Sequence, residues 1–299
     1  MLSISSRHRY ALALTTAAAS WGVATVIAKR AVTEIPPTTL LPVQLAASLT
    51  MLIPAVLLKR DRMPWSPELR RLGYLGILNP GISYALSLIG LAYITASLSV
   101  LLWATEPILI IGFAWWVLGE KVDRRLIGAA AVALVGVVLV LSQGQGGGGH
   151  PLGVILTLAG VAACASYTVV TRKWIASEST IEVVAIQQAA ALGFAVVLAG
   201  LVSAFTSSEP VTASAAAWAS AIGSGILYYG IAFWLYLTGL RHVPATWAGL
   251  FLNFIPVFGI TAGYLLLDER LSPRQWVGAV LITAVGVLAS RQTTVAAER

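Results

Sequence analysis

One acidic residue, Glu106, lies far from both ends of the apolar stretch that contains it. A charged side chain at the centre of a bilayer costs about 2.5–3.5 kcal/mol on insertion scales, so such a residue is a candidate functional site. Pro107 follows it and has no N–H, which leaves the carbonyl of Trp103 without its helical partner. With Ser99 on the same face, this carboxyl, carbonyl and indole could bind an ammonium group. The alternative is a structural carboxyl bonded to a neighbouring helix.

A second polar group surrounds a predicted break in the stretch 71–91. Asn79, Pro80 and Gly81 stand near its middle, and Pro80 is a candidate hinge. Ser83 and Ser87 follow Asn79 at four-residue spacing, so the three side chains share one helical face. An amide and two hydroxyls could meet a substrate carboxylate. For the serines alone, hydrogen bonding between helices is the favoured interpretation.

The second half of the chain repeats some of these features. Asn253 stands three residues before Pro256. Because Pro256 has no N–H, the carbonyl of Leu252 loses its helical partner. Pro107 and Pro256 are both candidate hinges. Four aromatic residues are candidate walls for a substrate side chain, namely Trp21, Tyr84, Tyr167 and Tyr229. Two glutamines are either cavity lining or partners in helix packing, namely Gln44 and Gln188.

The composition decides what kind of element positions these residues. The chain has 299 residues, of which 58% are hydrophobic and only 10% charged. A soluble domain carries about a quarter charged residues, and the apolar runs here are long enough to cross a bilayer core of about 30 Å. The fold class predicted is therefore an all-α polytopic membrane protein. The single cysteine, Cys164, lies in an apolar run and is interpreted as packing.

Apolar runs predict ten transmembrane helices. We place them at 9–29, 37–58, 71–91, 95–118, 125–142, 151–171, 181–204, 215–238, 244–267 and 273–290. The first run continues past the length of a signal peptide and is interpreted as a retained span.

The basic residues predict the orientation. With a cytoplasmic N-terminus, only Lys29, Arg30, Arg270 and Arg274 of the 19 Lys and Arg residues lie outside. Cytoplasmic loops are enriched in Lys and Arg, so both termini are predicted to be cytoplasmic. This use of charge in loops also argues against nucleic-acid binding.

Two halves of the chain resemble each other. A shift of 144 residues aligns Gln44 with Gln188, and a shift of 149 aligns Pro107 with Pro256. We predict a five-helix repeat at 1–143, a Gly-rich extracytoplasmic linker at 144–150 and a second five-helix repeat at 151–299. Because five is odd, the repeats are inverted in the membrane. Inverted repeats are typical of secondary transporters, which bind substrate near the middle of the membrane. A duplication that only enlarged a helical bundle is the alternative.

Two motifs resemble a known family. Pro107 through Gly119-Glu120-Lys121-Val122, and Pro256 through Asp268-Glu269-Arg270-Leu271, are similar to the EamA-type repeat of the drug/metabolite transporter superfamily. The segments 166–174 and 84–88 resemble YddG-type aromatic amino-acid exporters more narrowly. The resemblance implies ten helices, a cavity lined by both halves and export across a bacterial inner membrane.

These observations predict a secondary transporter that exports aromatic and other neutral amino acids by alternating access. The alternatives are a proton-coupled exporter of cationic drugs or other small metabolites and, outside transport, a lipid scramblase or a membrane scaffold. No metal cluster, catalytic Ser/His arrangement or phosphate-binding loop stands out in the sequence, so neither an enzyme nor a cofactor is expected. The expected partners are a small-molecule substrate and the lipid bilayer, with a monomer as the working expectation.

Overall fold

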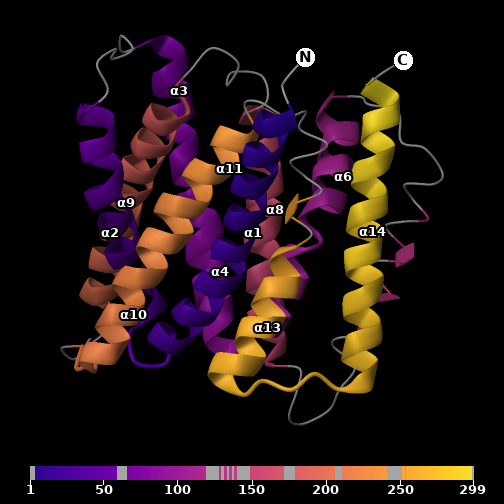
Figure 1. Ribbon diagram of the computed structural model, residues 1–299. Coiled ribbons are helices and arrows are strands. Elements are labelled where there is room, and N and C mark those ends of the chain that lie inside the picture. The colour runs from indigo at the N-terminus through magenta and orange to yellow at the C-terminus, as the bar shows by residue number, and fades with distance from the viewer. Residues whose placement is uncertain are drawn as a thin grey trace.

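The computed structural model describes residues 4–58, 66–118, 128, 131–132, 135–136, 138–139, 149–171, 179–205, 211–240, 251–252 and 254–297. In these ranges the secondary structure is helical. The helices are α1 (Ile4–Val32), α2 (Pro37–Leu57), α3 (Pro67–Gly76), η1 (Ile77–Ile82), α4 (Ser83–Tyr93), α5 (Ala96–Trp103), α6 (Glu106–Leu118), α8 (Pro151–Thr171), α9 (Thr180–Phe205), α10 (Ala215–Gly225), η2 (Ile226–Ala232), α11 (Phe233–Leu240), α13 (Ile255–Leu267) and α14 (Pro273–Ala297). They run side by side as a bundle, with the start of α1 and the end of α14 at the same end (Figure 1).

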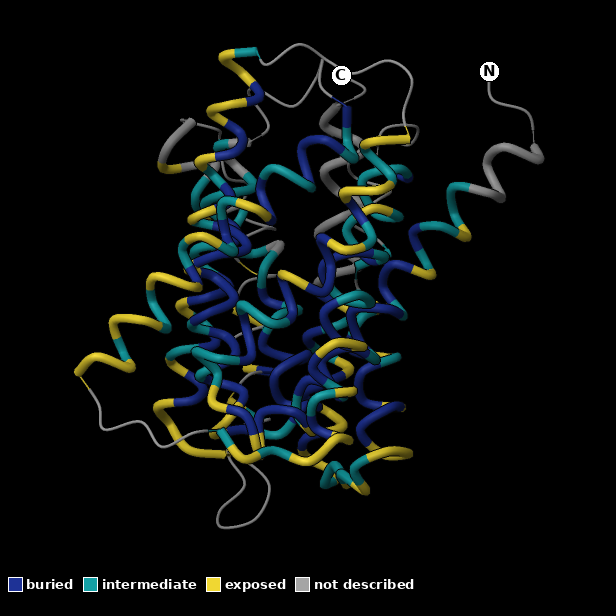
Figure 2. Tube along the Cα trace, turned by 90° about the vertical axis from the view of Figure 1, so that its left-hand side faces the viewer, coloured by how far each residue is buried: buried dark blue, intermediate teal, exposed yellow. Residues whose placement is uncertain are grey.

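Several helices are long and apolar enough to span a membrane. Among the described residues there are six, at Tyr10–Val32, Pro37–Leu57, Pro67–Tyr93, Pro151–Thr168, Thr180–Phe205 and Ala215–Gly239. Shorter apolar helices lie at Ala96–Ile110 and Ile255–Leu267. Large apolar side chains such as Trp116 and Leu265 are exposed on the outside of the bundle, where exposed residues alternate with buried ones along each helix (Figure 2). Lipid-facing apolar surface of this kind confirms a multi-pass membrane protein.

The predicted count of ten spans stays a prediction. The predicted span at 125–142 and the first part of the span at 244–267 lie largely outside the described residues, as does most of the linker at 144–150. The predicted span at 95–118 is not one continuous helix, which corrects the sequence-based assignment. It consists of α5 and α6, separated by a turn at Ala104 and Thr105.

Proline chemistry explains the interruption between α5 and α6. Pro107 has no N–H to donate within the helix, so the helical ladder cannot pass through it. The carbonyl of Thr105 accepts instead from the N–H groups of Ile108 and Leu109, at 3.0 and 3.3 Å, and starts a new helix. Glu106 therefore stands in the first turn of α6, where an acidic side chain is favoured by the helix dipole.

The predicted break at Asn79, Pro80 and Gly81 is confirmed. Asn79 has φ −145° and ψ 117°, which is extended backbone inside the π-helical segment η1. A second π-helical segment, η2, interrupts the corresponding stretch of the second half. A shift of 149 residues places Ile77 on Ile226, the first residues of η1 and η2. A π-helical segment therefore begins at matching positions of the two predicted repeats, although the extended backbone at Asn79 belongs to η1.

Helices from the two halves interleave. Helix α1 packs against α10, α11 and α13, while α8 packs against α4 and α6. Helix α2 packs against α9 and α10, and α9 packs against α3 as well. Gly76 and Gly225 let their helices pack closely against backbone of the other half. A Cβ added to Gly76 would lie 2.3 Å from the carbonyl oxygen of Gln187, and one added to Gly225 would lie 2.4 Å from the carbonyl oxygen of Gln44. These glycines are related by the 149-residue shift, so both halves use the same packing device.

Two glutamates tie the halves together at the end of the bundle opposite the start of α1. Ser214 donates to Glu34 from its N–H at 2.7 Å and from its hydroxyl at 3.0 Å. Glu269 accepts from the N–H groups of Ala96 and Ser97, at 2.8 and 2.9 Å, and from the Ser97 hydroxyl at 2.6 Å. Each carboxylate lies at a helix N-terminus, where negative charge is stabilised. We call these two contacts the glutamate clamps.

Candidate functional site

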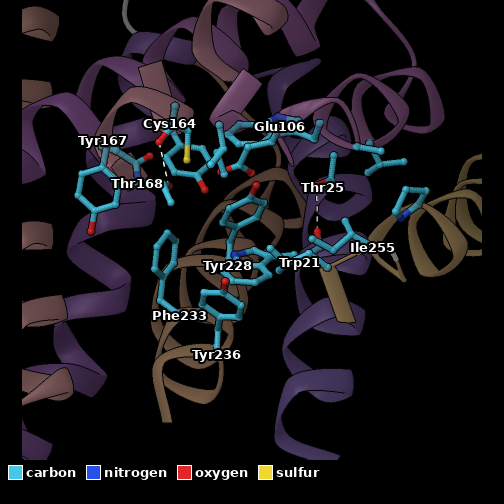
Figure 3. A pocket seen from close by; sticks show the side chains of 18 of the residues that line it. Trp21, Thr25, Glu106, Cys164, Tyr167, Thr168, Tyr228, Phe233, Tyr236 and Ile255 are labelled. Carbon is cyan, nitrogen blue, oxygen red and sulfur yellow. Dashed lines mark hydrogen bonds between the residues drawn. The ribbon is translucent and has the colours of Figure 1, made fainter. Parts of the chain in front are cut away.

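A cavity of about 190 Å³ lies inside the bundle. Its described wall comes from both halves of the chain and consists of Trp21, Thr25, Asn79, Tyr84, Val100, Trp103, Ala104, Glu106, Ile110, Cys164, Tyr167, Thr168, Tyr228, Phe233, Tyr236, Leu237, Leu252, Ile255 and Pro256. Figure 3 shows how side chains from α1, α6, α8, α11 and α13 converge on it. The wall residues of α8, namely Cys164, Tyr167 and Thr168, lie in the second half of that helix, which leads toward the end that holds both termini.

Seven aromatic residues contribute to the described wall of the cavity. Trp21 meets Phe233 and Tyr236 edge to face, with ring centroids 5.3 Å apart in both pairs. Tyr84 stacks on Trp103, and it meets Tyr228 edge to face at 5.2 Å. Offset and edge-to-face pairs are the favoured arrangements of aromatic rings. The rings therefore support one another and leave a rigid apolar surface toward the cavity.

Glu106 contributes the carboxyl group of the cavity wall, as the sequence led us to expect. The break before α6 directs it into the cavity, whose wall also contains Cys164. The sequence interpretation of Cys164 as packing was incomplete, because the residue is buried but also lines the cavity. Ser99 does not join Trp103 and Glu106 on one cavity face, since the turn at Ala104 and Thr105 changes the helical phase between them.

Two further polar atoms of wall residues have no partner within the described part of the chain. They are the indole nitrogen Nε1 of Trp21 and the side-chain oxygen Oδ1 of Asn79. The two residues are 7% and 1% exposed. Buried polar groups are nearly always hydrogen-bonded, and an unpaired one costs about 1–3 kcal/mol. One donor and one acceptor of the wall residues are therefore left unpaired in this conformation.

Other predicted site residues lie in contacts between helices. Gln44 donates to the Ser224 hydroxyl at 2.7 Å, and Gln188 donates to the carbonyl of Tyr229 at the same distance. The hydroxyl of Ser83 donates to the carbonyl of Gly160 at 2.8 Å. None of these residues is in the described wall of the large cavity. For the glutamines and Ser83, the geometry thus favours the packing interpretation.

The predicted hinges lie at irregular points of the helices. Pro256 lines the cavity at the start of α13, and Pro80 is buried within η1. Pro107 stands in the first turn of α6, and its side chain is outside what the structure describes, as is all of Asn253.

The tyrosines of η2 reveal a limit of helical periodicity. The sequence made Tyr229 a candidate wall residue, but the large cavity is lined by Tyr228 and Tyr236 instead. Tyr229 is 2% exposed and packs behind Tyr84, at 5.2 Å between ring centroids. A π-helical turn contains one residue more than an α-helical turn and shifts the phase of the residues on either side. Phe233 also lines the cavity and was not named from the sequence, although it follows Tyr229 by four residues. Tyr167, a predicted wall residue, lines the cavity and donates to Gln187 at 2.9 Å.

A comparison with protein-family models identifies the family of this chain. The model describes the EamA-like transporter family, and it matches twice, at residues 8–142 and 151–291. The chain belongs to the EamA-like transporter family.

Relatives of this EamA-like transporter agree with that assignment. The transporter YvbV of Bacillus subtilis is 27% identical over 92% of this chain and 90% of its own length. The transporter YetK of the same organism is 26% identical over 65% of this chain and 60% of its own length. A transporter of Clostridium kluyveri is 32% identical, but the match spans only 34% of this chain and 35% of that protein.

The fold of the EamA-like chain also occurs in a solved crystal structure. That structure has a TM-score of 0.64 and 20% sequence identity, and the match covers 94% of this chain and 98% of the other. At this identity the likeness concerns the fold alone. The family is one of transporters rather than enzymes.

Proposed function

We propose that this EamA-like transporter exports amino acids, aromatic and other neutral ones, from the cytoplasm by alternating access. The observation that carries the proposal is the cavity between the two halves, which is walled by aromatic rings and contains a carboxyl group and two unpaired polar atoms. Ligand sites are typically of this kind, mostly apolar with a few placed polar groups.

An amino acid matches this wall in chemistry. Its ammonium group fits the carboxyl of Glu106 and the free oxygen of Asn79, both of which accept hydrogen bonds. Its carboxylate fits the indole N–H of Trp21, which can only donate. The stacked and edge-to-face rings then suit an apolar or aromatic side chain.

Two inverted repeats of five transmembrane helices fit the packing. Matching π-helical segments, matching glycine contacts and two family matches of similar length support the duplication. The asymmetric distribution of basic residues supports cytoplasmic termini, so the cavity would lie toward the cytoplasm. The glutamate clamps would then close the outer end, and the structure would represent the inward-facing state.

One observation also favours a second candidate, a proton-coupled exporter of organic cations. Glu106 and Trp103 both line the cavity, and a carboxyl beside an aromatic face attracts cations without requiring a substrate carboxylate. The two candidates therefore differ in whether the donor from Trp21 is needed. The family assignment leaves the scramblase and scaffold alternatives without support of their own.

Transport into liposomes that contain only this protein separates the candidates. Radiolabelled phenylalanine, leucine and tetraphenylphosphonium are offered in turn, each in competition with the others, with and without a pH gradient. The proposal expects saturable amino-acid transport that unlabelled amino acids inhibit and organic cations do not. Amino-acid methyl esters, which lack the carboxylate, should compete poorly. Transport of tetraphenylphosphonium that amino acids fail to inhibit would favour the second candidate.

A further inference from the structure

Three helices close the bundle between the large cavity and the end that the glutamate clamps hold, which we call the clamp end. Val26 of α1, Ala96 of α5 and Ala262 of α13 form one buried apolar cluster, which we call the plug. Each of these helices also carries wall residues of the cavity, namely Trp21 and Thr25 on α1, Val100 and Trp103 on α5, and Ile255 and Pro256 on α13. Along all three helices, the plug therefore lies between the cavity and the clamp end.

The three helices approach one another closely within one turn of the plug. A Cβ added to Gly22 of α1 would lie 2.7 Å from the backbone nitrogen of Gly259 in α13. A Cβ added to Gly259 would in turn lie 2.7 Å from Cγ1 of Val100 in α5. Ordinary contacts between carbon atoms are about 3.5–4.0 Å long, so the three helices leave no space for a passing molecule here. By this route, a molecule in the cavity reaches the clamp end only after α1, α5 and α13 separate.

Two charged side chains hold the three helices together on the clamp side of the plug. Lys29 of α1 donates to the carbonyl of Leu91 at 2.8 Å. Glu269, which follows α13, accepts from the N–H groups of Ala96 and Ser97 at 2.8 and 2.9 Å. Lys29 thus meets the C-terminus of α4 and Glu269 the N-terminus of α5, so each charge faces a helix end of opposite polarity. We call Lys29 and Glu269 the latch, because both bind the turn that joins α4 to α5.

The contacts of the plug and the latch are of kinds that can open and close repeatedly. The plug consists of apolar side chains, so its separation breaks no side-chain hydrogen bond. Lys29 and Glu269 are both partly exposed, and water can replace their partners when the turn moves away. By contrast, Gln44 and Gln188 join α2, α9 and α10 through buried hydrogen bonds that water does not reach. The plug and the latch are therefore better suited to movement than the contacts of α2.

We propose that the plug is the gate of the large cavity toward the clamp end, and that the latch holds this gate shut. The opening of the gate during transport rests on the proposed function, whereas the barrier itself does not. When the turn between α4 and α5 leaves both charges, α5 moves away from α1 and α13 and takes Val100 and Trp103 with it. The cavity then opens on this side.

Cys164 reports on the gate, because it is the single cysteine of the chain and lines the large cavity. Membrane vesicles of both orientations are treated with a small cationic methanethiosulfonate, which does not cross the bilayer. With the latch intact, reagent on the clamp face should leave Cys164 largely unmodified. Glu269→Gln and Lys29→Met should each raise the rate of modification from that face roughly fivefold, the population shift expected when one hydrogen bond of the closed state is lost.

Neighbouring charges provide matched controls. Asp268→Asn and Arg30→Met remove a charge of the same sign beside each latch residue, from exposed positions, and should leave Cys164 protected. Asp268 pairs with Arg270 rather than with the turn. Lys29→Arg keeps a donor and should also keep the protection. Arg30→Cys in a Cys164→Ser background identifies the vesicle face that carries the clamp end.

Modification of wild-type Cys164 from the clamp face as fast as in the latch variants would overturn the gate, and so would latch variants in which Cys164 stays protected. A variant that has lost its fold exposes Cys164 from both faces and melts at a lower temperature. Glu269→Asp, which shortens the side chain but keeps the charge, then takes its place and should raise the rate less.

Transport into liposomes decides the second part of the proposal. The latch variants should transport amino acids more slowly than the two controls, because a cavity that stays open at the clamp end does not complete the cycle. Exposure of Cys164 with transport at the wild-type rate would overturn the opening of the gate as a step of transport. If the wild type transports no amino acid while the latch variants expose Cys164, the proposed function fails and the gate stands.

Discussion

The rings of Tyr84 and Trp103 are stacked, with centroids 5.3 Å apart and planes inclined by 16°. Tyr84 comes from the first turn of α4, directly after the break at Asn79, and Trp103 is the last residue of α5, directly before the turn that precedes Glu106. Both rings line the large cavity. Two interruptions of regular helix thus meet at one aromatic contact in the wall of the large cavity.

Trp103→Ala should weaken amino-acid binding by roughly 2- to 10-fold, since an aromatic contact contributes about 0.5–1.5 kcal/mol beyond buried area. Trp103→Phe keeps a stacking ring and should lose less. Binding to purified protein by calorimetry measures the effect. Trp116→Ala is the control, because Trp116 is 76% exposed on the outside of the bundle. Equal affinity of wild type and Trp103→Ala would remove this ring from the site.

Glu106→Gln should weaken binding of amino acids by roughly 5- to 10-fold, because a hydrogen bond to a charged acceptor is about 1 kcal/mol stronger than one to a neutral acceptor. The substitution keeps the shape of the side chain beside Cys164. It should also flatten the dependence of transport on pH, since protons and substrate no longer compete for the carboxyl. Initial rates in liposomes between pH 5 and 8, roughly the physiological range, provide the test. A variant that matches the wild type at each pH would make Glu106 structural.

Alanine at Pro107 or Pro256 should lower the transport rate more than the substrate affinity. Both prolines stand at the start of a helix that follows an interruption, α6 and α13, and a restored N–H would allow more continuous helix there. Steps that limit turnover are often conformational rather than chemical. Stopped-flow transport and equilibrium binding on the same preparations separate the two effects. Unchanged turnover in both variants would identify the prolines as fixed structural features.

Glu34→Gln should reduce thermal stability at neutral pH and make stability less dependent on pH below about 4.3, the ordinary pKa of glutamate. The N–H and hydroxyl of Ser214 hold the pKa of the Glu34 carboxyl below its usual range in the folded chain. A lowered pKa adds stability above the unfolded value, and this stability disappears as pH falls through the folded value. Melting temperatures in detergent from pH 3 to 7 measure it. Glu68→Gln, at the start of α3, is a control at a similar helix position.

The orientation predicts that Gly147→Cys reacts with a membrane-impermeant thiol reagent added to intact cells. Gly147 belongs to the predicted extracytoplasmic linker and lies outside the described residues. A Cys164→Ser background leaves no other thiol, because the chain has a single cysteine. Labelling that requires permeabilised cells would reverse the orientation and would place the large cavity toward the outside.

The break at Asn79 was located from the sequence, because proline removes a backbone donor wherever it stands. The same argument marked Pro107 as a candidate hinge, although the span at 95–118 was predicted as one helix. The sequence also predicted a membrane protein, since a chain with so few charges and such long apolar runs cannot fold as a soluble domain. The inward direction of Glu106 followed from the same physics, as an ionisable side chain avoids lipid. Local chemistry was sufficient for each of these predictions.

Only the tertiary structure decided which polar groups are left free. Gln44 and Gln188 match in the repeat, yet Gln44 keeps an unpaired oxygen while Gln188 accepts from Ser48 and donates to Tyr229. Tyr228 rather than Tyr229 faces the cavity, because the extra residue in η2 shifts the helical phase. Hydrogen-bond partners come from helices distant in sequence, and a π-helical turn changes every later residue's direction. A periodic pattern along one helix carries neither piece of information.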